Sequence, residues 1–449
     1  MLLTIAAFFF VLSIVVLVHE FGHFIVAKLN GIFVITFSIG FGPKILKKRV
    51  GETEYALSAL PFGGYVKFAG ESFEDVESGN EAAEGEEAEI PEERMYRSKS
   101  PIQKMSVVIA GPLMNAVLAL LVYILSLFFE GVYINPSTVV KEIRGGSPAE
   151  IAGFEVGDRI IEINGESFEY WGEIDRLVTF EEGVGSRFKV IRGADTVEVE
   201  VVPEYDPESE LWSLGIHSPI PPKIGNVKRD SPADEAGIKP GAVILSINDT
   251  LVTKYSELTE IIHPRPGIPM KFVWELEGER HTAEITPDFV QAPGEGERVD
   301  VVKIGGIGVG PYYEKRKIHF IDAVRYGSRA FMNLFVSIME FLGKLFTGRA
   351  TLRAVGGPLR VGQMAGDMIR WGFDYLVYFL AFFSLNLSIF NLLPILPFDG
   401  GHFVLYVFEF ISGRPINKKL HQVMMQVGFV ILISLMAFIL LIDIFNIFR

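Results

Sequence analysis

The sequence predicts a multi-span α-helical membrane protein with four transmembrane helices, a membrane-associated β-loop region and two extracytoplasmic α+β domains. Three observations predict this class. Four apolar stretches are long enough to cross a bilayer, which takes about 20 residues. A block of sequence occurs twice, without gaps, in the middle of the chain. Hydrophobic residues make up 49% of the 449 residues, and the mean hydropathy of +0.33 is high for a soluble protein.

The four predicted spans are the longest apolar stretches of the chain. They cover residues 1–27, 105–129, 371–398 and 421–442. The first stretch has no basic n-region and no convincing cleavage site, so we interpret it as a retained helix and not as a signal peptide. It is interrupted only by the group HEFGH, from His19 to His23.

Basic side chains near the spans predict their orientation. Lys and Arg residues follow the first span, precede the second, and lie between the third and the fourth. Cytoplasmic loops carry an excess of these residues. We therefore expect segments 28–104 and 399–420 in the cytoplasm. Both termini and the 130–370 segment are expected on the outer side.

Charge and composition exclude several classes of protein. The net charge of -14 comes largely from an acidic insert at residues 71–93, which we expect to be a flexible loop of unassigned role. A strongly acidic chain without a basic patch argues against nucleic-acid binding. The chain has no cysteine, so any metal site has to use His, Asp or Glu side chains.

The internal repeat predicts two small domains outside the membrane. The stretch Ile143–Gly165 aligns with Val227–Asp249 at an offset of 84 residues. Each copy reads as a turn, a short helix, a Gly turn, a strand and an N-G or N-D hairpin. The pattern resembles the PDZ domain of bacterial proteases, and we expect the domains at 131–205 and 212–290. The stretches WSLGIHSP (Trp212–Pro219) and IGGIGVGP (Ile304–Pro311) are expected to border the second copy.

Residues 319–347 carry an amphipathic helical pattern, with polar and apolar residues on opposite sides. The longest uncharged run inside this stretch is too short to span a bilayer. It therefore predicts a helix that lies along the outer membrane interface.

The group HEFGH predicts a metal site. H-E-x-x-H on a helix places two histidines at i and i+4, so that both imidazoles can reach one Zn²⁺. Here these are His19 and His23, and Glu20 beside them can act as a general base toward water. Two histidines in a soluble core are more often ordinary hydrogen-bonded residues. At bilayer depth an ionisable group is costly and by default marks a functional site, which favours the metal.

A catalytic zinc also needs a third protein ligand and an open position. At 1.5 Å per residue, His19 lies on the order of 27 Å from the outer start of its helix, near the cytoplasmic end. The third span runs inward and ends in NLLPILPFDGGH, so Asp399 arrives at a similar depth. We expect Asp399 to be the third ligand. His402 is the competing candidate, and we expect it in the cytosol because it lies past two glycines.

Together these motifs resemble the bacterial site-2 proteases. HEFGH in the first span, AGPLMN (Ala110–Asn115) opening the second, the tandem PDZ-like copies, and N-x-x-P-x-x-x-x-D-G before the last span occur in that order over nearly the whole chain. The pattern is most similar to the intramembrane zinc proteases of the sigma-E envelope-stress pathway. The resemblance implies that His19, His23 and Asp399 ligate zinc, that Glu20 is the catalytic base, and that Asn391 forms hydrogen bonds in the active site.

The same resemblance implies a location and a class of partner. It implies a multi-pass protein of the bacterial cytoplasmic (inner) membrane, with the active site toward the cytoplasmic side. Its substrates would be transmembrane proteins similar to anti-sigma factors, with signal-peptide remnants as a second class. The two PDZ-like domains would act as a size filter or as peptide-binding modules. The alternative for these domains is a purely structural role.

Two further stretches match the resemblance. IGFGPKILKK (Ile39–Lys48) resembles a re-entrant β-loop beside the zinc, and PFGGYVKFAG (Pro61–Gly70) resembles a strand that pairs with the substrate. Unwinding a substrate helix in lipid leaves N–H and C=O groups unpaired at several kcal/mol each, and a strand edge can take up those bonds. The expected substrate contacts are Gly40, Phe41, Gly42, Gly64, Tyr65, Val66 and Lys67.

Two other classes of function stay open. A membrane zinc transporter or sensor predicts polar residues along several spans, whereas the second and fourth spans carry no charged residue. A catalytically inactive PDZ scaffold has no need of a base, so the presence of Glu20 beside the histidines argues against it.

Overall fold

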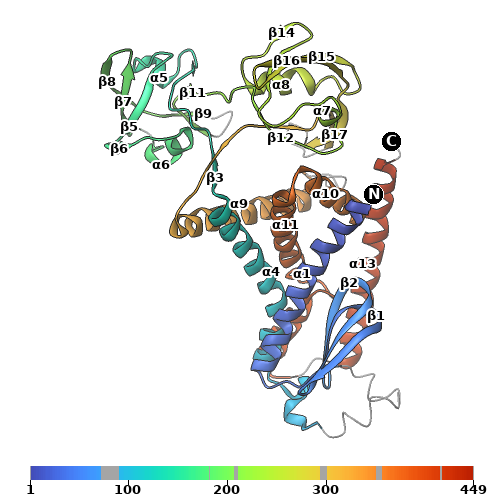
Figure 1. The fold of residues 1–449 in the computed structure, drawn as a ribbon. Coiled ribbons are helices and arrows are strands. Elements are labelled where there is room, and N and C mark those ends of the chain that lie inside the picture. The colour runs from blue at the N-terminus through green and yellow to red at the C-terminus, as the bar shows by residue number, and fades with distance from the viewer. Residues whose placement is uncertain are drawn as a thin grey trace. The chain divides into compact units, whose positions relative to one another are not determined.

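The computed structural model describes residues 2–71, 90–181, 183–206, 211–293, 301–349, 356–414 and 417–447. The chain divides into two compact units. The first comprises Met1–Leu127, Gly294–Val301 and Phe320–Arg449, and the second comprises Phe128–Pro293 and Val302–His319. The first unit is mainly helical and the second is rich in β-strands (Figure 1). Most of the acidic insert 71–93 lies outside the described residues, so its expected flexibility stays a prediction.

The first unit contains the long apolar helices of the chain. Within the described residues, four helices are long and apolar enough to cross a membrane. They are α1 (Leu2–Leu29), α4 (Pro101–Glu130), α11 (Phe373–Asn391) and α13 (Lys418–Ile447). They overlap the four predicted spans. The orientation of these helices stays a prediction.

The end of the third span differs from the sequence expectation. We expected the third span to run to residue 398, with an irregular backbone at Pro394 and Pro397, and a loop at 399–420. Helix α11 instead ends at Asn391, and a new helix, α12, runs from Asp399 to Ser412. The two prolines of the intervening turn cannot donate helical hydrogen bonds, which ends the first helix. Asp399 in the first turn of α12 interacts favourably with the positive end of the new helix.

Two more helices precede α11. Helix α9 (Phe320–Phe346) occupies the stretch with the amphipathic pattern, and its place at the membrane interface stays a prediction. Helix α10 (Pro358–Trp371) was not predicted. Its first turn is capped from another helix, because the buried Asp443 carboxylate of α13 accepts hydrogen bonds of 3.3 Å from the amides of Gly357 and Arg360. This contact satisfies amides that have no partner inside α10.

Small residues allow α1, α4 and α11 to pack closely. A Cβ at Gly22 of α1 would lie 2.4 Å from the carbonyl oxygen of Ala110 on α4, so only glycine fits there. On the other side of α4, the hydroxyls of Ser384 and Ser388 donate to the carbonyls of Asn115 and Pro112 at 2.8 and 2.7 Å. These hydroxyl bonds join α11 to α4, as expected for helix contacts in a membrane.

Between α1 and α4 the chain forms a bent antiparallel hairpin of β1 (Val34–Val50) and β2 (Thr53–Phe68). The beginning of β1 pairs with both halves of β2: Ile39 lies opposite Gly64 on one side and Leu57 on the other. The end of β2 is therefore an outer segment, and no strand among the described residues pairs with its far side. Two short 3₁₀ turns, Glu92–Arg94 and Tyr96–Ser98, lead into α4.

The second unit holds two domains with the same order of strands. The first consists of β3 (Val132–Ile134), β4 (Glu142–Ile143), α5 (Pro148–Ile151), β5 (Arg159–Ile163), β6 (Glu166–Ser167), a 3₁₀ turn (Trp171–Glu173), α6 (Ile174–Leu177), β7 (Ser186–Arg192), β8 (Asp195–Val201), β9 (Glu204–Asp206), β10 (Leu211–Ser213) and β11 (Ile216–His217). The second consists of β12 (Ile224–Val227), α7 (Pro232–Glu235), β13 (Val243–Ile247), β14 (Thr250–Leu251), α8 (Tyr255–Ile262), β15 (Met270–Leu276), β16 (Glu279–Ile285), β17 (Asp288–Pro293), β18 (Val301–Gly306) and β19 (Val309–Pro311), with β20 (Glu314–Arg316) pairing back onto β3. Their four-stranded sheets have the equivalent orders β6-β5-β7-β8 and β14-β13-β15-β16.

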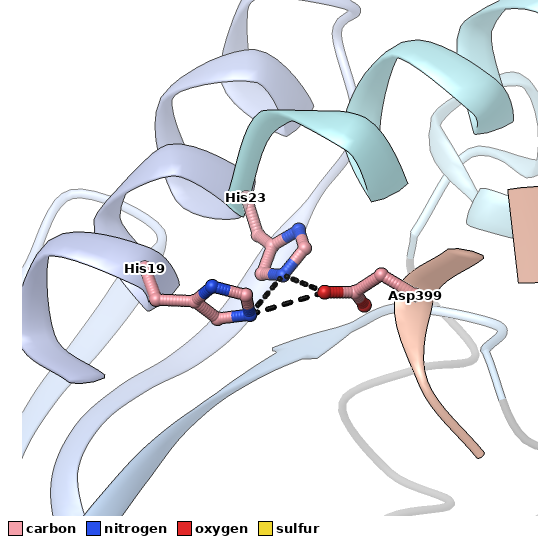
Figure 2. A group of neighbouring side chains, drawn as sticks. All are labelled: His19, His23 and Asp399. Atoms are coloured by element: carbon pink, nitrogen blue, oxygen red, sulfur yellow. Dashed lines mark hydrogen bonds and ion pairs between the residues drawn. The ribbon is translucent and has the colours of Figure 1, made fainter. Parts of the chain in front are cut away.

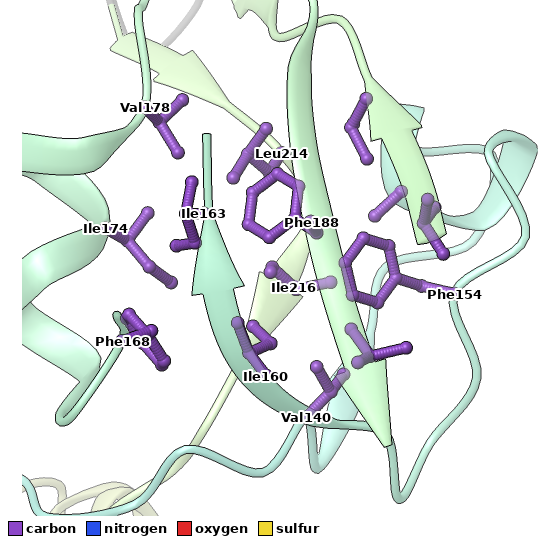
Figure 3. Packing of buried hydrophobic residues seen from close by; sticks show 14 of the residues in the cluster. Val140, Phe154, Ile160, Ile163, Phe168, Ile174, Val178, Phe188, Leu214 and Ile216 are labelled. Carbon is purple, nitrogen blue, oxygen red and sulfur yellow. The ribbon is translucent and has the colours of Figure 1, made fainter. Parts of the chain in front are cut away.

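The matched residues of the repeat occupy matched places in the two domains. Ser147 and Ser231 cap the short helices α5 and α7 through hydrogen bonds from main-chain amides. The first core is built around Ile160, Ile163 and Phe188 (Figure 3). The second core uses the residues 84 positions later, Ile244, Ile247 and Phe272.

The expected domain boundaries, 131–205 and 212–290, need correction at the closing strand of each domain. We expected WSLGIHSP to border the second domain, but Leu214 and Ile216 lie in the core of the first domain, where β11 pairs with β4. The equivalent stretch of the second domain is IGGIGVGP, where Ile307 lies in the core and β19 pairs with β12. Each domain is thus closed by a strand that follows its four-stranded sheet. The alignment of the repeat stops before these strands, so it could not show that the first of them belongs to the first domain.

Candidate metal centre and active site

The side chains of His19, His23 and Asp399 come together in the first unit (Figure 2). His19 and His23 lie one turn apart on α1, and Asp399 is the first residue of α12. Their nearest ligand atoms, one from each residue, all lie within 4.8 Å of one another. The ring atom Nε2 of His19 lies 3.1 Å from Oδ2 of Asp399, and Nε2 of His23 lies 3.6 Å from the same oxygen. The two Nε2 atoms are 3.2 Å apart.

This donor set fits a tetrahedral zinc ion. Ligand atoms at about 2.05 Å from a tetrahedral centre are about 3.3 Å from each other, and the three separations in this site lie close to that value. Two imidazoles and one carboxylate form a ligand set typical of catalytic zinc, and three ligands leave a fourth position open. The residues present therefore fit zinc both in type and in spacing.

The turn before α12 brings Asp399 to the histidines. Leu392 still bonds to the end of α11, through its amide and the carbonyls of Ser388 and Ile389. The two glycines after Asp399 then pack directly on this turn. A Cβ at Gly400 would lie 2.2 Å from the Leu392 carbonyl oxygen, and a Cβ at Gly401 would lie 2.6 Å from the Leu396 amide nitrogen. The pair of glycines therefore sets how closely Asp399 approaches the site.

A third glycine leaves room for the imidazoles. A Cβ at Gly111 of α4 would lie 2.3 Å from Nε2 of His23 and 2.9 Å from Cε1 of His19. Any side chain at this position would displace both rings. Gly111 belongs to the AGPLMN motif, which we noted as a family element without assigning a role to this residue.

Hydrogen bonds from α4 and α11 surround the histidines. Nδ1 of His23 donates to the carbonyl of Val107 at 2.8 Å, which leaves Nε2 free to ligate. Nδ1 of His19 lies 3.3 Å from Nδ2 of the fully buried Asn115. Nδ2 of Asn391, at the end of α11, lies 3.5 Å from Nε2 of His19. Sequence reasoning found Asn391 but missed Val107, and it noted Asn115 only as the end of AGPLMN without a role. The signal for both residues is a contact between two helices.

Glu20 lies between the histidines and the β-hairpin. A Cβ at Gly64 of β2 would lie 3.3 Å from Cγ of Glu20, and the Val66 amide is within hydrogen-bonding reach of the Glu20 carboxylate. The structure therefore brings the predicted base next to the outer segment of β2, which contains Gly64, Tyr65, Val66 and Lys67.

The other predicted residues lie away from the three ligand atoms. Gly40 and Gly42 have positive φ values of 87° and 85° and form the bend of β1. The ring of Phe41 between them stacks on Tyr65, with ring centroids 6.1 Å apart. His402 is not part of the group of three, and its ring instead faces His421 at 5.8 Å.

Comparison with known proteins agrees with this geometry. The profile of peptidase family M50 matches residues 7–435. A protein of Neisseria meningitidis that is provisionally named as a zinc metalloprotease is 31% identical over 97% of this chain and 97% of its own length. The regulator of sigma E protease of Haemophilus influenzae is 29% identical over 98% of both chains. RseP, the regulator of sigma-E protease of Salmonella typhimurium, is also 29% identical over 98% of both chains.

One solved structure has a local likeness. The PDZ domain of an SdrC-like protein from Listeria monocytogenes covers 21% of this chain at 20% identity, with a TM-score of 0.17, which is too low to carry an argument. The match over nearly the whole sequence is decisive for the family. The resemblance to the site-2 proteases is confirmed, and the chain belongs to peptidase family M50.

Proposed function

We propose that the chain is a zinc-dependent intramembrane endopeptidase of the site-2 type. The observation that carries this proposal is the approach of His19, His23 and Asp399 to one point, with Glu20 beside the first ligand. A purely structural zinc site has no need of a base or of an open fourth position. The names of the relatives, which include zinc metalloproteases and regulators of sigma E, support the same activity.

The reaction is the hydrolysis of a peptide bond. When bound, zinc supplies a Lewis acid that polarises the carbonyl to be cut. Glu20 takes a proton from the attacking water and gives it to the amine that leaves when the C–N bond breaks. The amide of Asn391 can donate a hydrogen bond to the carbonyl oxygen as negative charge develops on it.

The β-hairpin presents the substrate. A transmembrane helix shields its carbonyls by internal hydrogen bonds, so it has to unwind before it is cut. The outer segment of β2, from Gly64 to Lys67, takes up the freed backbone groups as an added strand. Its contact with Glu20 keeps the unwound chain close to the base. The bend at Gly40, Phe41 and Gly42 supports this segment through the stacking of Phe41 on Tyr65.

The substrates are transmembrane proteins similar to anti-sigma factors, and signal-peptide remnants form a second class. The enzyme resides in the bacterial inner membrane, with both termini and the two β-rich domains on the outer side. Lys and Arg residues near the predicted cytoplasmic ends of the helices support this orientation. The names of the Haemophilus and Salmonella relatives support the sigma-E pathway.

The two repeated domains are PDZ domains that act as a size filter. A bulky outer domain on a substrate is excluded before its helix reaches the zinc. The test removes both domains and keeps the pairing of β3 with β20, by joining Ile134 to Glu314 through an Asn-Gly turn, since these two residues are opposite each other. Under the filter, this variant cuts untrimmed substrates. If it binds zinc and still rejects them, the filter lies elsewhere.

Peptide capture is the alternative role for these domains. Gly215 and Gly308 occupy equivalent places, where a Cβ would lie 2.1 Å from Ser147 and 2.4 Å from Ser231. A large residue at either glycine would therefore break the domain and would not probe a groove. Exposed residues suit the test better, such as His217 of β11 or Arg229 after β12. Under capture, their substitution by Glu slows cleavage of trimmed substrates, whereas under a filter the rate is unchanged.

The experiment that tests the activity combines metal analysis with cleavage. The full chain is purified in detergent, its zinc content is measured, and it is incubated with a helical membrane substrate with and without a chelator. We expect one zinc per chain and cleavage that stops when zinc is removed. A protein that binds zinc but never cuts would favour a transporter, sensor or scaffold. A protein that cuts without zinc would contradict the proposal.

A further inference from the structure

The environment of Asn115 is unusual. Its side chain is fully buried on α4, and its Oδ1 is one of the few buried side-chain atoms in the described part of the chain without a hydrogen-bond partner. A buried polar atom without a partner destabilises the folded state. Nδ2 of the same amide lies 3.3 Å from Nδ1 of His19. The amide therefore faces a candidate zinc ligand while its oxygen remains unused.

The ligand geometry decides which nitrogen of His19 carries a proton. Its Nε2 lies 3.1 Å from Asp399 and 3.2 Å from Nε2 of His23, so Nε2 is the atom that faces the metal position. A neutral imidazole has one N–H group, and a nitrogen that ligates zinc carries none. Nδ1 of His19 is therefore a donor when zinc is bound. A donor facing the NH₂ group of Asn115 forms no hydrogen bond.

A rotation of the amide by 180° about the Cβ–Cγ bond removes this mismatch of two donors. It exchanges Oδ1 and Nδ2, so that the unused oxygen faces Nδ1 of His19. We propose that Asn115 is a positioning residue, which accepts the Nδ1–H hydrogen bond of His19 and so holds Nε2 toward the metal. This inference rests on the proposed zinc ligation by His19.

The backbone around Asn115 suits this role. The Ser384 hydroxyl of α11 donates to the main-chain carbonyl of Asn115 at 2.8 Å, which fixes this turn of α4. His23 uses the same principle one turn away, since its Nδ1 donates to the Val107 carbonyl of α4. The Gly111 carbonyl also lies close to His19 and is the competing acceptor. The experiment therefore has to distinguish acceptance by the Asn115 side chain from acceptance by the Gly111 main-chain carbonyl.

The test measures the zinc affinity of the purified full chain by competition with a chromophoric chelator. Asn115→Leu keeps the approximate size and removes the acceptor, whereas Asn115→Asp keeps an acceptor and cannot donate. Partners of ligating histidines typically change metal affinity by about 10–100-fold. We expect Asn115→Leu to lose at least about tenfold. Asn115→Asp should bind at least as tightly as the unchanged chain. Ser384→Ala, which loosens the same turn without touching the amide, is the matched control and should leave the affinity unchanged.

Each outcome decides the inference. Equal zinc affinity of Asn115→Leu and the unchanged chain would show that the Gly111 carbonyl suffices. Loss in Asn115→Asp would show that the amide acts as a donor, and this variant decides the case if Asn115→Leu does not fold. A loss in Ser384→Ala as large as in Asn115→Leu would assign the effect to packing. Failure of the unchanged chain to bind zinc would instead contradict the proposed function, so the two failures are distinguishable.

Discussion

Gly64 of β2 lies directly against Glu20 of α1, where a Cβ at Gly64 would stand 3.3 Å from Cγ of Glu20. The predicted base and the strand predicted to hold the substrate are thus neighbours, although one belongs to a membrane helix and the other to a hairpin. On its other side Gly64 packs on the backbone of β1, with the same Cβ position 2.8 Å from the Ser38 carbonyl oxygen. The strand is therefore held close to the base by contacts that a larger residue would break.

The first prediction concerns the base. Glu20→Gln keeps the shape of the side chain but cannot accept a proton, and Glu20 is not among the three candidate ligands. We expect unchanged zinc content and a loss of cleavage by about 10²–10⁴-fold. Metal analysis and a cleavage assay on the same sample check this. His23→Ala, which removes a candidate ligand, should lose both zinc and cleavage. Normal cleavage by Glu20→Gln would refute the assignment of the base.

The second prediction concerns the space for the imidazoles. Gly111→Ala places a methyl group 2.3 Å from Nε2 of His23 and 2.9 Å from Cε1 of His19, so both rings have to move. We expect zinc affinity to fall by about tenfold or more, measured by chelator competition. Gly343→Ala is the matched control, because this helical glycine has no atom within 4 Å of the added methyl. If Gly111→Ala binds zinc as tightly as Gly343→Ala, the histidines do not hold the metal in the arrangement described above.

The third prediction concerns the outer segment of β2. Tyr65→Pro and Val66→Pro each remove one backbone donor from this segment. Neighbouring amides of a strand point to opposite edges, so one of the two variants removes a donor from the outer edge. We expect slower cleavage of a transmembrane substrate with unchanged zinc content, since neither residue is a candidate ligand. Lys48→Pro, on the opposite outer segment of the hairpin, controls for damage to the hairpin itself and should have the smaller effect. Full activity in both Tyr65→Pro and Val66→Pro would show that the substrate is not presented by this strand.

The fourth prediction concerns an ion pair that only the first domain contains. The buried Asp158 accepts hydrogen bonds of 2.8 and 2.7 Å from Arg192, whereas the residues 84 positions later are Ala242 and Leu276. Arg192→Leu alone leaves a buried carboxylate unpaired and should lower the free energy of unfolding of this domain by roughly 3 kcal/mol. This value is at the low end for a broken buried pair, because Arg192 is partly exposed. Asp158→Ala combined with Arg192→Leu copies the second domain and should recover most of this loss. Hydrogen exchange of the β7 amides in the full chain measures both effects.

The same pair sets the pH dependence of the first domain. Burial favours the neutral form of the Asp158 carboxyl, but the hydrogen bonds and charge of Arg192 outweigh it, so the pKa of Asp158 is lowered from its usual 3.8. Because the pKa is lowered in the folded state, the pair contributes its full stabilisation at any pH above the usual pKa of the unfolded state. This stabilisation is lost only as the pH falls through the lower pKa of the folded state. We therefore expect β7 protection to be insensitive to this group from neutral pH down to about pH 4. A loss of protection between pH 7 and 5 that disappears in the double variant would contradict this.

Local patterns in the sequence determined much of this protein. The apolar stretches locate the helices that can cross a membrane, because their length has to match the bilayer. The spacing of His19 and His23 places both rings on one face of a helix, because residues four apart are neighbours there. The repeat predicts two similar domains, because the same turn, helix and hairpin residues recur at matched positions. Each of these signals lies within a short stretch of chain.

The tertiary structure alone decided what depends on contacts between distant stretches. The roles of Gly111 and Asn115 appear only when α4 packs against α1, because neither residue belongs to the local metal motif. Helix α12 starts at Asp399 because the turn before it packs on Gly400 and Gly401. The hydrophobic periodicity of the sequence does not predict this contact. The strand that closes the first domain follows its sheet in the sequence and was assigned to the wrong domain for that reason. The periodicity of a sequence predicts the helix or strand to which a residue belongs. Which strand or side chain it then contacts depends on packing over the whole unit.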